Sequence, residues 1–411
     1  MKVCVIGGGA AGMMSATMIA RKGHSVVLFE KNEKLGKKIY ITGKGRCNVT
    51  NVAVGDDFLK NIVNGRKFVM GAITRFNSVD TQNFFEELGL KLKIERGGRL
   101  FPESDKSSDV IKALEKALKW AGVEVNLNSR VEEIIKKDDG IFGVKVNGKV
   151  HEFDAVIVAT GGVTYPSTGS TGDGYKFAKS VGHSIVEPKP ALCAIKTIEK
   201  DIFDVQGLSL KNVKLIARNK EKIIYESEVG EMLFTDSGVS GPIALSCSSF
   251  INRCDLSSVE LAIDFKPALT IDTLLNRIDR DIEKLKAKQF SSLLEGFLPK
   301  SLVKIFAKRL GINLTFKANQ VDKEKRKKLA FLLKNFKLTP KCLENIDYAI
   351  VTSGGVNLKE INPKYMKSKL VSGLYFVGEV LDVDALTGGF NLQLAFSTAV
   401  ACSSEFADLR G

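Results

Sequence analysis

The N-terminal segment alternates short apolar runs with one longer helical pattern. An apolar run at residues 3–6 is followed by glycines, helical periodicity extends from Ala10 to about Lys22, and a second apolar run covers residues 25–29. Short apolar runs on either side of a helix are typical of buried parallel strands in a βαβ unit. The pattern therefore predicts strand, helix and strand before Glu30.

The same α/β alternation is expected to continue to residue 187. A hairpin is favoured where two apolar runs flank Asn147-Gly148, because this dipeptide suits a tight type I′ turn. A later apolar run ends at Gly161-Gly162, and glycines just past a strand mark the edge of an α/β sheet at which ligands bind. The predicted helices cover residues 80–88 and 107–121, and the predicted strands cover residues 123–127, 130–135, 141–146, 150–153 and 154–162.

The pattern changes near residues 188–190. Short strand-like runs follow, then a mostly helical stretch, then further strand-like runs at 348–351 and 373–378 and an apolar helix from about 390 to 407. This order predicts a nucleotide-binding domain that is interrupted by a β-rich domain, which itself carries a basic helical insertion. The predicted boundaries are residues 1–187 and 366–411 for the first domain, 188–269 and 337–365 for the second, and 270–336 for the insertion.

Gly7, Gly9 and Gly12 form a G-x-G-x-x-G motif between the first predicted strand and helix. The first glycine allows a tight turn, the second lets the backbone approach a pyrophosphate, and the third lets helix and strand pack closely. The helix N-terminus offers free N–H groups and a positive dipole end to the phosphates. Glu30, at the end of the second strand, is placed to accept hydrogen bonds from ribose hydroxyls. A dinucleotide site is therefore expected.

Several classes of protein are disfavoured by the composition. Three histidines far apart in sequence make a Ser-His-Asp hydrolase or a histidine-rich metal centre improbable, and no metal site is expected. No apolar run approaches the ~18–20 residues that span a membrane, and no cleavage site for a signal peptide precedes Glu30. An odd, scattered set of cysteines favours reduced thiols and a cytoplasmic location. These cysteines are Cys4, Cys47, Cys193, Cys247, Cys254, Cys342 and Cys402.

Positive charge is concentrated in one segment. The net charge is +14, and residues 284–341 hold sixteen Lys/Arg against three Asp/Glu, so that +13 lies there. Such a patch suits an anionic partner, either nucleic acid or an acidic membrane surface, and a lysine-rich solvated helix face explains it equally well. The candidate RNA contacts are Lys325, Arg326, Lys327 and Lys328.

Three more glycine clusters join the first. They read GKGRCNVTN at residues 43–51, ATGGVTYPSTGSTGDG at residues 159–174, and GLYFVGEVLDVDALTGGFNLQLA at residues 373–395. A dinucleotide with a bulky second half needs contacts from distant chain segments. Glycine motifs on both sides of an insertion provide such contacts, which favours FAD over NAD.

These motifs resemble the FAD-dependent oxidoreductases that include the aminoacetone oxidase-like and BaiN-like flavoproteins. The resemblance covers nearly the whole chain. It implies an α/β fold: a glutathione-reductase-like FAD-binding Rossmann domain with an inserted β-barrel-like domain that carries a helical subdomain. One departure is Ala385, where many relatives have glycine, but Gly388 and Gly389 remain.

The resemblance also implies which residues bind FAD. The pyrophosphate would lie on the first glycine motif, the adenosine ribose on Glu30 with Lys31 beside it, and the adenine on the backbone of Val131. The residues at 42–48 and 160–162 would line the flavin, and those at 378–393 would contact the ribityl chain and the edge of the flavin. In full, the implied cofactor residues are Gly7, Gly9, Ala10, Ala11, Gly12, Glu30, Lys31 and Val131, then Thr42, Gly43, Arg46, Asn48, Thr160, Gly161 and Gly162, then Gly378, Glu379, Gly388, Gly389, Phe390, Asn391, Leu392 and Gln393.

Two residues are candidate catalytic groups. Cys47 follows Arg46, and a neighbouring cation would lower the pKa of a thiol, although a small buried residue packing against the cofactor is the simpler interpretation. Tyr165 could line the substrate face or could be a turn residue before Pro166.

Reduced flavin carries negative charge, and a helix beginning near Phe390 would stabilise that charge with its N–H groups.

Three functions are compatible with the sequence. The first is hydride transfer to or from a small substrate, as an amine oxidase or an enone reductase. The second, which is the sharpest, is reduction of a uridine in ribosomal RNA to dihydrouridine, which the resemblance implies because some relatives are connected with that reaction. Uracil contains an enone-like C=C bond, and the basic segment suits phosphates. The third is a non-catalytic, flavin-stabilised RNA-binding protein. No second G-x-G-x-x-G unit is present, so NADH or NADPH would bind only transiently as electron donor.

Overall fold

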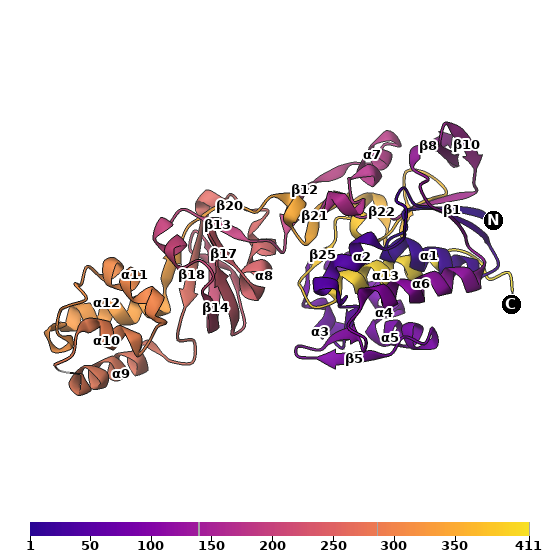
Figure 1. The fold of residues 1–411 in the computed structure, drawn as a ribbon. Helices are drawn as coiled ribbons and strands as arrows, with labels where there is room; N and C mark the ends of the chain where they lie inside the picture. The colour runs from indigo at the N-terminus through magenta and orange to yellow at the C-terminus, as the bar shows by residue number, and fades with distance from the viewer. Residues whose placement is uncertain (139, 286, 411) are drawn as a thin grey trace. The chain divides into compact units, whose positions relative to one another are not determined.

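The computed structural model describes residues 1–138, 140–285 and 287–410. The chain forms two compact units (Figure 1): unit 1 contains Met1–Pro190 and Ile346–Gly411, and unit 2 contains Ala191–Asn345. Lys286 of the basic segment lies outside the described residues. None of the helices in the described ranges combines the length and apolarity needed to cross a membrane.

The centre of unit 1 is a seven-stranded sheet in the order β22-β23-β24-β11-β1-β2-β7, in which the strands from β24 to β7 are parallel. Val3, Cys4 and Val5 of the central strand are fully buried, as expected for a parallel strand covered on both faces. The predicted βαβ unit is therefore confirmed. The strands are β1 (Lys2–Ile6), β2 (Ser25–Phe29), β7 (Glu124–Asn126), β11 (Ala155–Val158), β22 (Ile361–Asn362), β23 (Lys367–Ser368) and β24 (Leu374–Phe376).

Helices of unit 1 pack on this sheet and on one another. Figure 1 shows α1, α6 and α13 side by side. The predicted helix 107–121 matches α6, which buries one apolar face and ends at Gly122 in the left-handed conformation that favours glycine. The helices are α1 (Ala10–Ala20), α2 (Lys37–Ile41), α3 (Gly55–Leu59), α4 (Arg66–Arg75), α5 (Ser78–Glu87), α6 (Ser107–Ala121), α7 (Asp173–Ser180) and α13 (Phe390–Ser403).

Among the described residues of unit 1, four small sheets accompany the large one. The predicted hairpin is present, and both turn residues, Asn147 and Gly148, have the positive φ of a type I′ turn (49° and 74°). The sheets contain β8 (Val131–Lys137), β9 (Gly140–Val146) and β10 (Lys149–Glu152); β3 (Thr50–Asn51), β5 (Leu92–Glu95) and β6 (Arg99–Pro102); β12 (Ile185–Ala191) and β21 (Val351–Val356); and β4 (Ile62–Asn64) and β25 (Asp384–Ala385).

Unit 2 is built on one antiparallel sheet in the order β19-β18-β14-β16-β17-β13-β20, with β15 beside β14. The two end strands, β19 and β20, are separated in the chain only by Thr339, so the sheet must curl until its edges meet. Helix α8 (Pro242–Ile251) packs against β14 and β16. The strands are β13 (Ile195–Thr197), β14 (Ser209–Asn219), β15 (Lys222–Glu226), β16 (Gly230–Phe234), β17 (Gly238–Ser240), β18 (Val259–Asp264), β19 (Phe336–Leu338) and β20 (Pro340–Leu343).

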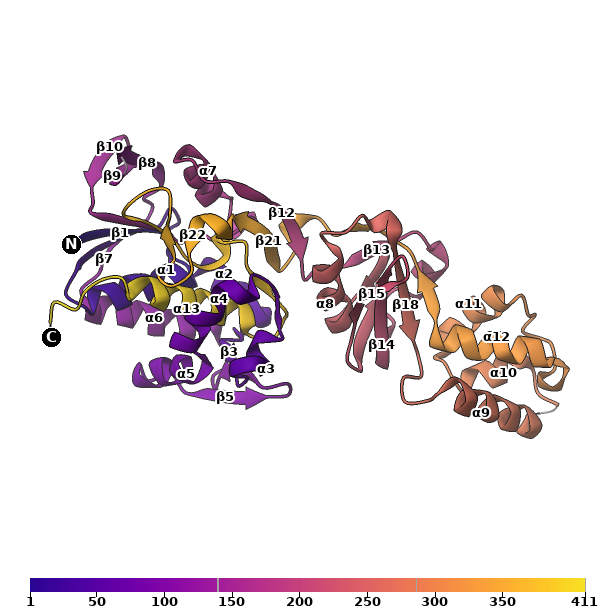
Figure 2. The same ribbon diagram turned by 180° about the vertical axis from the view of Figure 1, so that it is seen from behind.

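The helical insertion lies between β18 and β19, which pair antiparallel with Ile263 opposite Phe336. Figure 2 shows its helices grouped together. The insertion shares a hydrophobic core with the sheet, because the rings of Phe306 and Phe336 stack at 5.2 Å and Phe265 packs edge-on against both. Its helices are α9 (Ile271–Lys284), α10 (Phe290–Glu295), α11 (Lys300–Leu310) and α12 (Lys323–Lys334).

The observed boundary after the insertion differs from the expected one. The sequence placed residues 337–365 in the β-rich domain, whereas unit 1 resumes at Ile346. The reason is that β21 pairs with β12, and Val356 and Ile361 are buried in the core of unit 1. The strand expected at 348–351 is also shifted, since a 3-10 turn covers Ile346–Tyr348 and β21 begins at Val351.

Candidate cofactor site

The glycines of the first motif have three different environments. Gly7 has φ of 107°, and a Cβ there would lie 2.7 Å from the carbonyl oxygen of Ala159. A Cβ on Gly12 would lie only 1.9 Å from the carbonyl oxygen of Gly7, whereas a Cβ on Gly9 would meet no atom within 4 Å. Gly7 and Gly12 are thus required by packing, and Gly9 leaves open the space that a pyrophosphate would need.

Glu30 is fixed beside this turn. Its Oε2 accepts a hydrogen bond from the Gly8 N–H at 2.7 Å, and its Oε1 accepts two from Asn32, at 2.8 Å from the backbone and 2.7 Å from the side chain. The carboxylate is buried yet has acceptor capacity beyond these three bonds. This geometry suits a group that receives ribose hydroxyls.

Lys31 is directed to a different partner. Its Nζ lies 2.8 Å from Asp173 Oδ2 and donates to Thr171 at 2.6 Å, and Arg130 reaches the other Asp173 oxygen at 3.0 Å. Burial disfavours the charged form of Asp173, but the two cations outweigh burial and lower the pKa of this carboxyl. The ammonium of Lys31 is therefore engaged by Asp173.

Stability should depend on pH through Asp173. Because its pKa is lower in the folded protein, its contribution is complete above the unfolded pKa of about 4 and is lost as pH falls through the folded pKa. Asp173→Asn should lower the free energy of unfolding at pH 7, and the difference from the wild type should shrink below pH ~4 in urea titrations. Lys176→Met is the control, since Lys176 is 3.9 Å from the carboxylate and exposed. A difference that stays constant down to pH ~3 would contradict the assignment.

Distant glycine clusters meet at the same turn. A Cβ on Gly378 would lie 2.7 Å from the Cβ of Ala11 at the start of α1. A Cβ on Gly162 would lie 2.1 Å from Thr352 Oγ1 and 3.1 Å from Glu379 Oε1. The glycine cluster at residues 373–395 is therefore in close contact with the first motif and with the cluster at residues 159–174. Such contacts are expected for segments that surround one cofactor.

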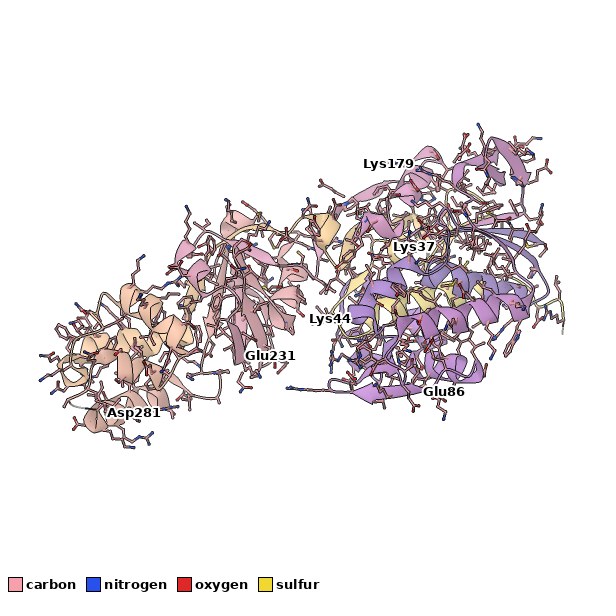
Figure 3. The ribbon with its side chains drawn as sticks, viewed as in Figure 1. Lys37, Lys44, Glu86, Lys179, Glu231 and Asp281 are labelled. Carbon is pink, nitrogen blue, oxygen red and sulfur yellow. The ribbon has the colours of Figure 1, made fainter. Side chains whose placement is uncertain are left out.

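An ion pair that the sequence analysis missed lies among these segments. Lys38 on α2 donates to Glu379 at 2.7 and 3.0 Å and to Thr164 Oγ1 at 2.7 Å. Glu379 also accepts from the Thr352 N–H at 2.9 Å. Nothing in the sequence distinguishes Lys38 from the neighbouring Lys37 (Figure 3). Lys37 pairs with the exposed Glu33.

The loop after α2 has an unusual backbone. Four of its residues have positive φ: Gly43 at 57°, Lys44 at 59°, Gly45 at 84° and Cys47 at 59°. For Lys44 and Cys47 this conformation costs about 1 kcal/mol or more each, and such strain is concentrated at binding and catalytic sites. A Cβ on Gly43 would lie 3.2 Å from the Asn48 backbone nitrogen, so the loop is also tightly turned.

Two buried polar atoms of the expected flavin set lack partners. Asn48 Oδ1 and Thr160 Oγ1 are buried and have no hydrogen bond to any described residue. Unpaired buried polar atoms are rare in folded proteins and point to a missing ligand or water. Together with the open side of Gly9, these two atoms show that the residues present fit FAD. The individual contacts between FAD and the protein stay a prediction.

The neighbouring Arg46 does not activate the thiol of Cys47. The Arg46 guanidinium is engaged by Glu95 and by Asp105, the latter at 2.7 Å from Nε, and lies over the Phe101 ring at 4.3 Å. Cys47 is fully buried, and burial raises the pKa of its thiol to about 12. A neutral buried thiol matches the alternative interpretation, a small residue that packs in the core.

Thiol labelling tests this environment. Iodoacetamide at pH 8 should modify the exposed Cys342 in the native protein and leave Cys47 unmodified, because a thiolate must form and be reached. Peptide mass spectrometry measures both sites in one sample, and labelling in urea provides the positive control. Modification of Cys47 as fast as Cys342 would contradict the assignment.

Other predicted residues have structural partners. Phe390 is buried and packs against Phe58 at 5.1 Å. Gln393 is fully buried and makes four side-chain hydrogen bonds, so its side chain is used inside unit 1. Asn391 bonds the N–H and C=O of Ala385, and Thr42 Oγ1 donates to the Ile39 carbonyl.

The remaining residues are placed as follows. Tyr165 has φ of 52° and precedes a 3-10 turn, and its N–H donates to Asp347 O at 3.1 Å. Val131 begins β8 opposite Val146. The N–H groups at residues 390–392 lie in the first turn of α13, where helix geometry leaves them without intrahelical acceptors.

The basic segment carries less free charge than its sequence suggested. The helical part at residues 270–336 has sixteen Lys/Arg and seven Asp/Glu, because α9 adds acids such as Asp281 (Figure 3), so its net charge is +9. Arg326 is not a free cation, since it pairs with Asp279 at 3.0 Å and donates to Val321 O. Lys325 and Lys328 pair with acids of their own helix turn, and Lys327 is exposed.

Comparisons with known proteins agree with this geometry. The chain matches the family described as HI0933-like protein Rossmann domain over residues 1–405. It is 31% identical over 417 residues to 3-dehydro-bile acid delta(4,6)-reductase of Clostridium scindens, with 99% of each chain covered. It is 32% identical over 404 residues to ribosomal RNA dihydrouridine synthase of Haemophilus influenzae, with 97% of this chain and 96% of the relative covered.

A solved structure shows the same fold. The 3-ketosteroid delta1-dehydrogenase of Sterolibacterium denitrificans, in complex with 1,4-androstadiene-3,17-dione, superposes with a TM-score of 0.52 at 13% identity, and 98% of each chain is covered. The α/β core, the glycine cradle and the full-length matches agree with one another. The chain therefore belongs to the HI0933-like family and is an FAD-dependent oxidoreductase with a Rossmann-type FAD-binding domain.

Proposed function

We propose that the protein reduces the C5=C6 bond of a uridine in ribosomal RNA and so forms dihydrouridine. FAD, when bound, supplies the hydride chemistry. NADH or NADPH is the proposed electron donor, and it would bind transiently because the sequence holds one G-x-G-x-x-G unit. The proposal is supported by the relative from Haemophilus influenzae, whose name states this product.

The observation that carries the proposal is the exposed basic surface of α11 and α12. Lys300, Lys304 and Lys308 follow one another at a spacing of four residues, so they share one face of α11, and all three are exposed. Such a row suits the regularly spaced phosphates of RNA. A small apolar substrate has no use for it.

The residues of unit 1 would hold the cofactor in ways that follow from their contacts. The open side of Gly9 and the N-terminus of α1 would bind the pyrophosphate, and Glu30 would receive the adenosine ribose. The Lys38–Glu379 ion pair would fix the segments on the flavin side. The N–H groups at the start of α13 would stabilise negative charge at the edge of the flavin.

Reduction of a small conjugated enone is the second candidate. It is favoured by the relative from Clostridium scindens, which is as similar as the RNA-modifying one and is named as a reductase of a bile acid. Both substrates present a C=C bond near a carbonyl group, so the same hydride chemistry serves either. The substrates differ in charge, which makes the basic surface the distinguishing feature.

Nucleoside analysis of ribosomal RNA tests the proposal. Mass spectrometry should find dihydrouridine in ribosomal RNA from the wild-type strain, less of it in a deletion strain, and its return when the wild-type gene is supplied. A Lys300→Gln/Lys304→Gln/Lys308→Gln variant should restore it incompletely. In vitro, FAD-loaded protein with NADPH should act on RNA from the deletion strain. Equal dihydrouridine in both strains, with turnover of a conjugated enone steroid, would favour the second candidate instead.

A further inference from the structure

Unit 2 has a surface pocket between the end of α11 and one face of α12. Its volume is about 380 Å³, and both walls belong to the helical part. The lining combines an aromatic ring, aliphatic side chains, three cations and one carboxylate. The lining residues are Arg309, Leu310, Glu324, Lys327, Lys328, Phe331 and Leu332.

Phe331 faces solvent from within this pocket. Its side chain is 54% exposed, whereas the neighbouring Ala330 and Leu333 on α12 are fully buried. A phenylalanine ring stabilises a fold by being buried, so the fold gains little from the exposed ring here. Single exposed apolar residues are common, and the cations around this ring are what single it out.

Two ammonium groups lie one helical turn from the ring. Lys327 and Phe331 are four residues apart and Lys328 and Phe331 are three apart, so both lysines share the face of the ring. Lys327 makes no ion pair with any residue in the described ranges, and Lys328 pairs with Glu324 while both remain exposed, which is a weak interaction. Arg309 lines the pocket but is not a free cation, because it pairs with Asp201 and its guanidinium carbon lies 3.8 Å from the centre of the Phe336 ring.

We propose that this pocket binds single-stranded RNA, with an unpaired base stacked on Phe331 and the adjoining phosphates on Lys327 and Lys328. An aromatic platform flanked by cations is how proteins hold single-stranded nucleic acid, because every base has a π face and every nucleotide a negative charge. The site rests on the proposed RNA substrate and names the part of unit 2 that recognises it. A base can stack only when it is unpaired, so loops are favoured over duplex.

Binding measurements on the FAD-loaded, full-length protein test the site. The probe is a twelve-nucleotide single-stranded RNA containing 2-aminopurine, compared with the same strand in a duplex. Phe331→Ala should weaken single-strand binding about tenfold, the effect of losing one stacked base, and should abolish the quenching of 2-aminopurine. Phe331→Trp should retain both. Lys327→Gln/Lys328→Gln should lower the slope of log K against log salt by about 1.4, or about 0.7 for each phosphate contact.

Matched controls separate the pocket from general charge and exposure. Phe316→Ala removes another exposed phenylalanine outside the pocket, and Lys288→Gln/Lys341→Gln removes two exposed lysines elsewhere in unit 2. Both controls should bind almost as the wild type does. Unchanged affinity and quenching in Phe331→Ala, or an equal loss in both lysine pairs, would overturn the site.

The outcomes distinguish this site from the proposed function. If Phe331→Ala binds RNA normally while the wild type still forms dihydrouridine, the pocket is wrong and the function stands. If RNA binds through Phe331 but ribosomal RNA contains no dihydrouridine that depends on the protein, the site stands and the uridine reduction is wrong.

Discussion

Replacing Gly9 by alanine should weaken FAD binding by about ten- to hundredfold and leave the fold intact. A Cβ at this position meets no protein atom within 4 Å, and the backbone there is extended, so the FAD-free protein has no reason to lose stability. The added methyl occupies the space that the pyrophosphate needs, and overfilling a close-packed site costs about 1–3 kcal/mol. Fluorescence titration of FAD-free protein measures the affinity, and urea unfolding measures the stability.

Gly12→Ala is the matched comparison and should behave differently. Its Cβ would lie 1.9 Å from the Gly7 carbonyl oxygen, so α1 must move away from β1 and the FAD-free protein should lose about 2–3 kcal/mol of stability. FAD affinity should fall as well. Unchanged FAD affinity in Gly9→Ala would show that the pyrophosphate does not approach this glycine, and equal destabilisation by both substitutions would remove the distinction between cradle and packing.

Replacing Lys38 by methionine should cost about 2 kcal/mol and weaken FAD binding. Removal of one partner of an ion pair leaves the other desolvated, and here Glu379 would keep the Thr352 N–H but lose the ammonium. Both side chains are about one-fifth exposed, so the cost is smaller than for a fully buried pair. Unfolding in urea, with and without FAD, measures both effects.

Lys37→Met is the control for this pair. Lys37 is the adjacent residue on the same short helix, and its partner Glu33 is largely exposed, so the loss of Lys37 should leave the free energy of unfolding almost unchanged. A double-mutant cycle with Glu379→Gln isolates the coupling energy of Lys38 with its partner. Equal effects of the two lysine substitutions would show that the internal ion pair contributes no more than the exposed one.

The elements with local signals were predicted correctly. The βαβ unit, helix 107–121 and the hairpin at Asn147-Gly148 each depend on periodicity or on turn chemistry within a few residues, and the structure confirms all three. The curled sheet and the helical insertion also appear in the predicted order. The family assignment followed from glycine motifs, whose spacing is conspicuous because close backbone contacts allow no side chain at positions such as Gly7 and Gly12.

Features that depend on distant partners were missed or were wrong. Lys38 forms an ion pair with Glu379, which is 341 residues away in the chain, and Arg326 forms one with Asp279. Neither partner could be identified from the local sequence. Cys47 follows Arg46 in sequence, but the guanidinium is held by Glu95 and Asp105 and the thiol is buried. Charge counted along a segment likewise overlooked the acids that α9 brings to the same helical part.

The pairing of β18 with β19 has a consequence for how this architecture can vary. Because Ile263 lies opposite Phe336, the polypeptide leaves the sheet and re-enters it at adjacent positions, as at the two arms of a hairpin whose tip has been lengthened into a group of helices. The register of the sheet is therefore independent of the length of this excursion, and such sites tolerate insertion and exchange. A replacement for the helical part must still cover the aromatic core that Phe306 shares with Phe336, but it need not change the pairing of the strands.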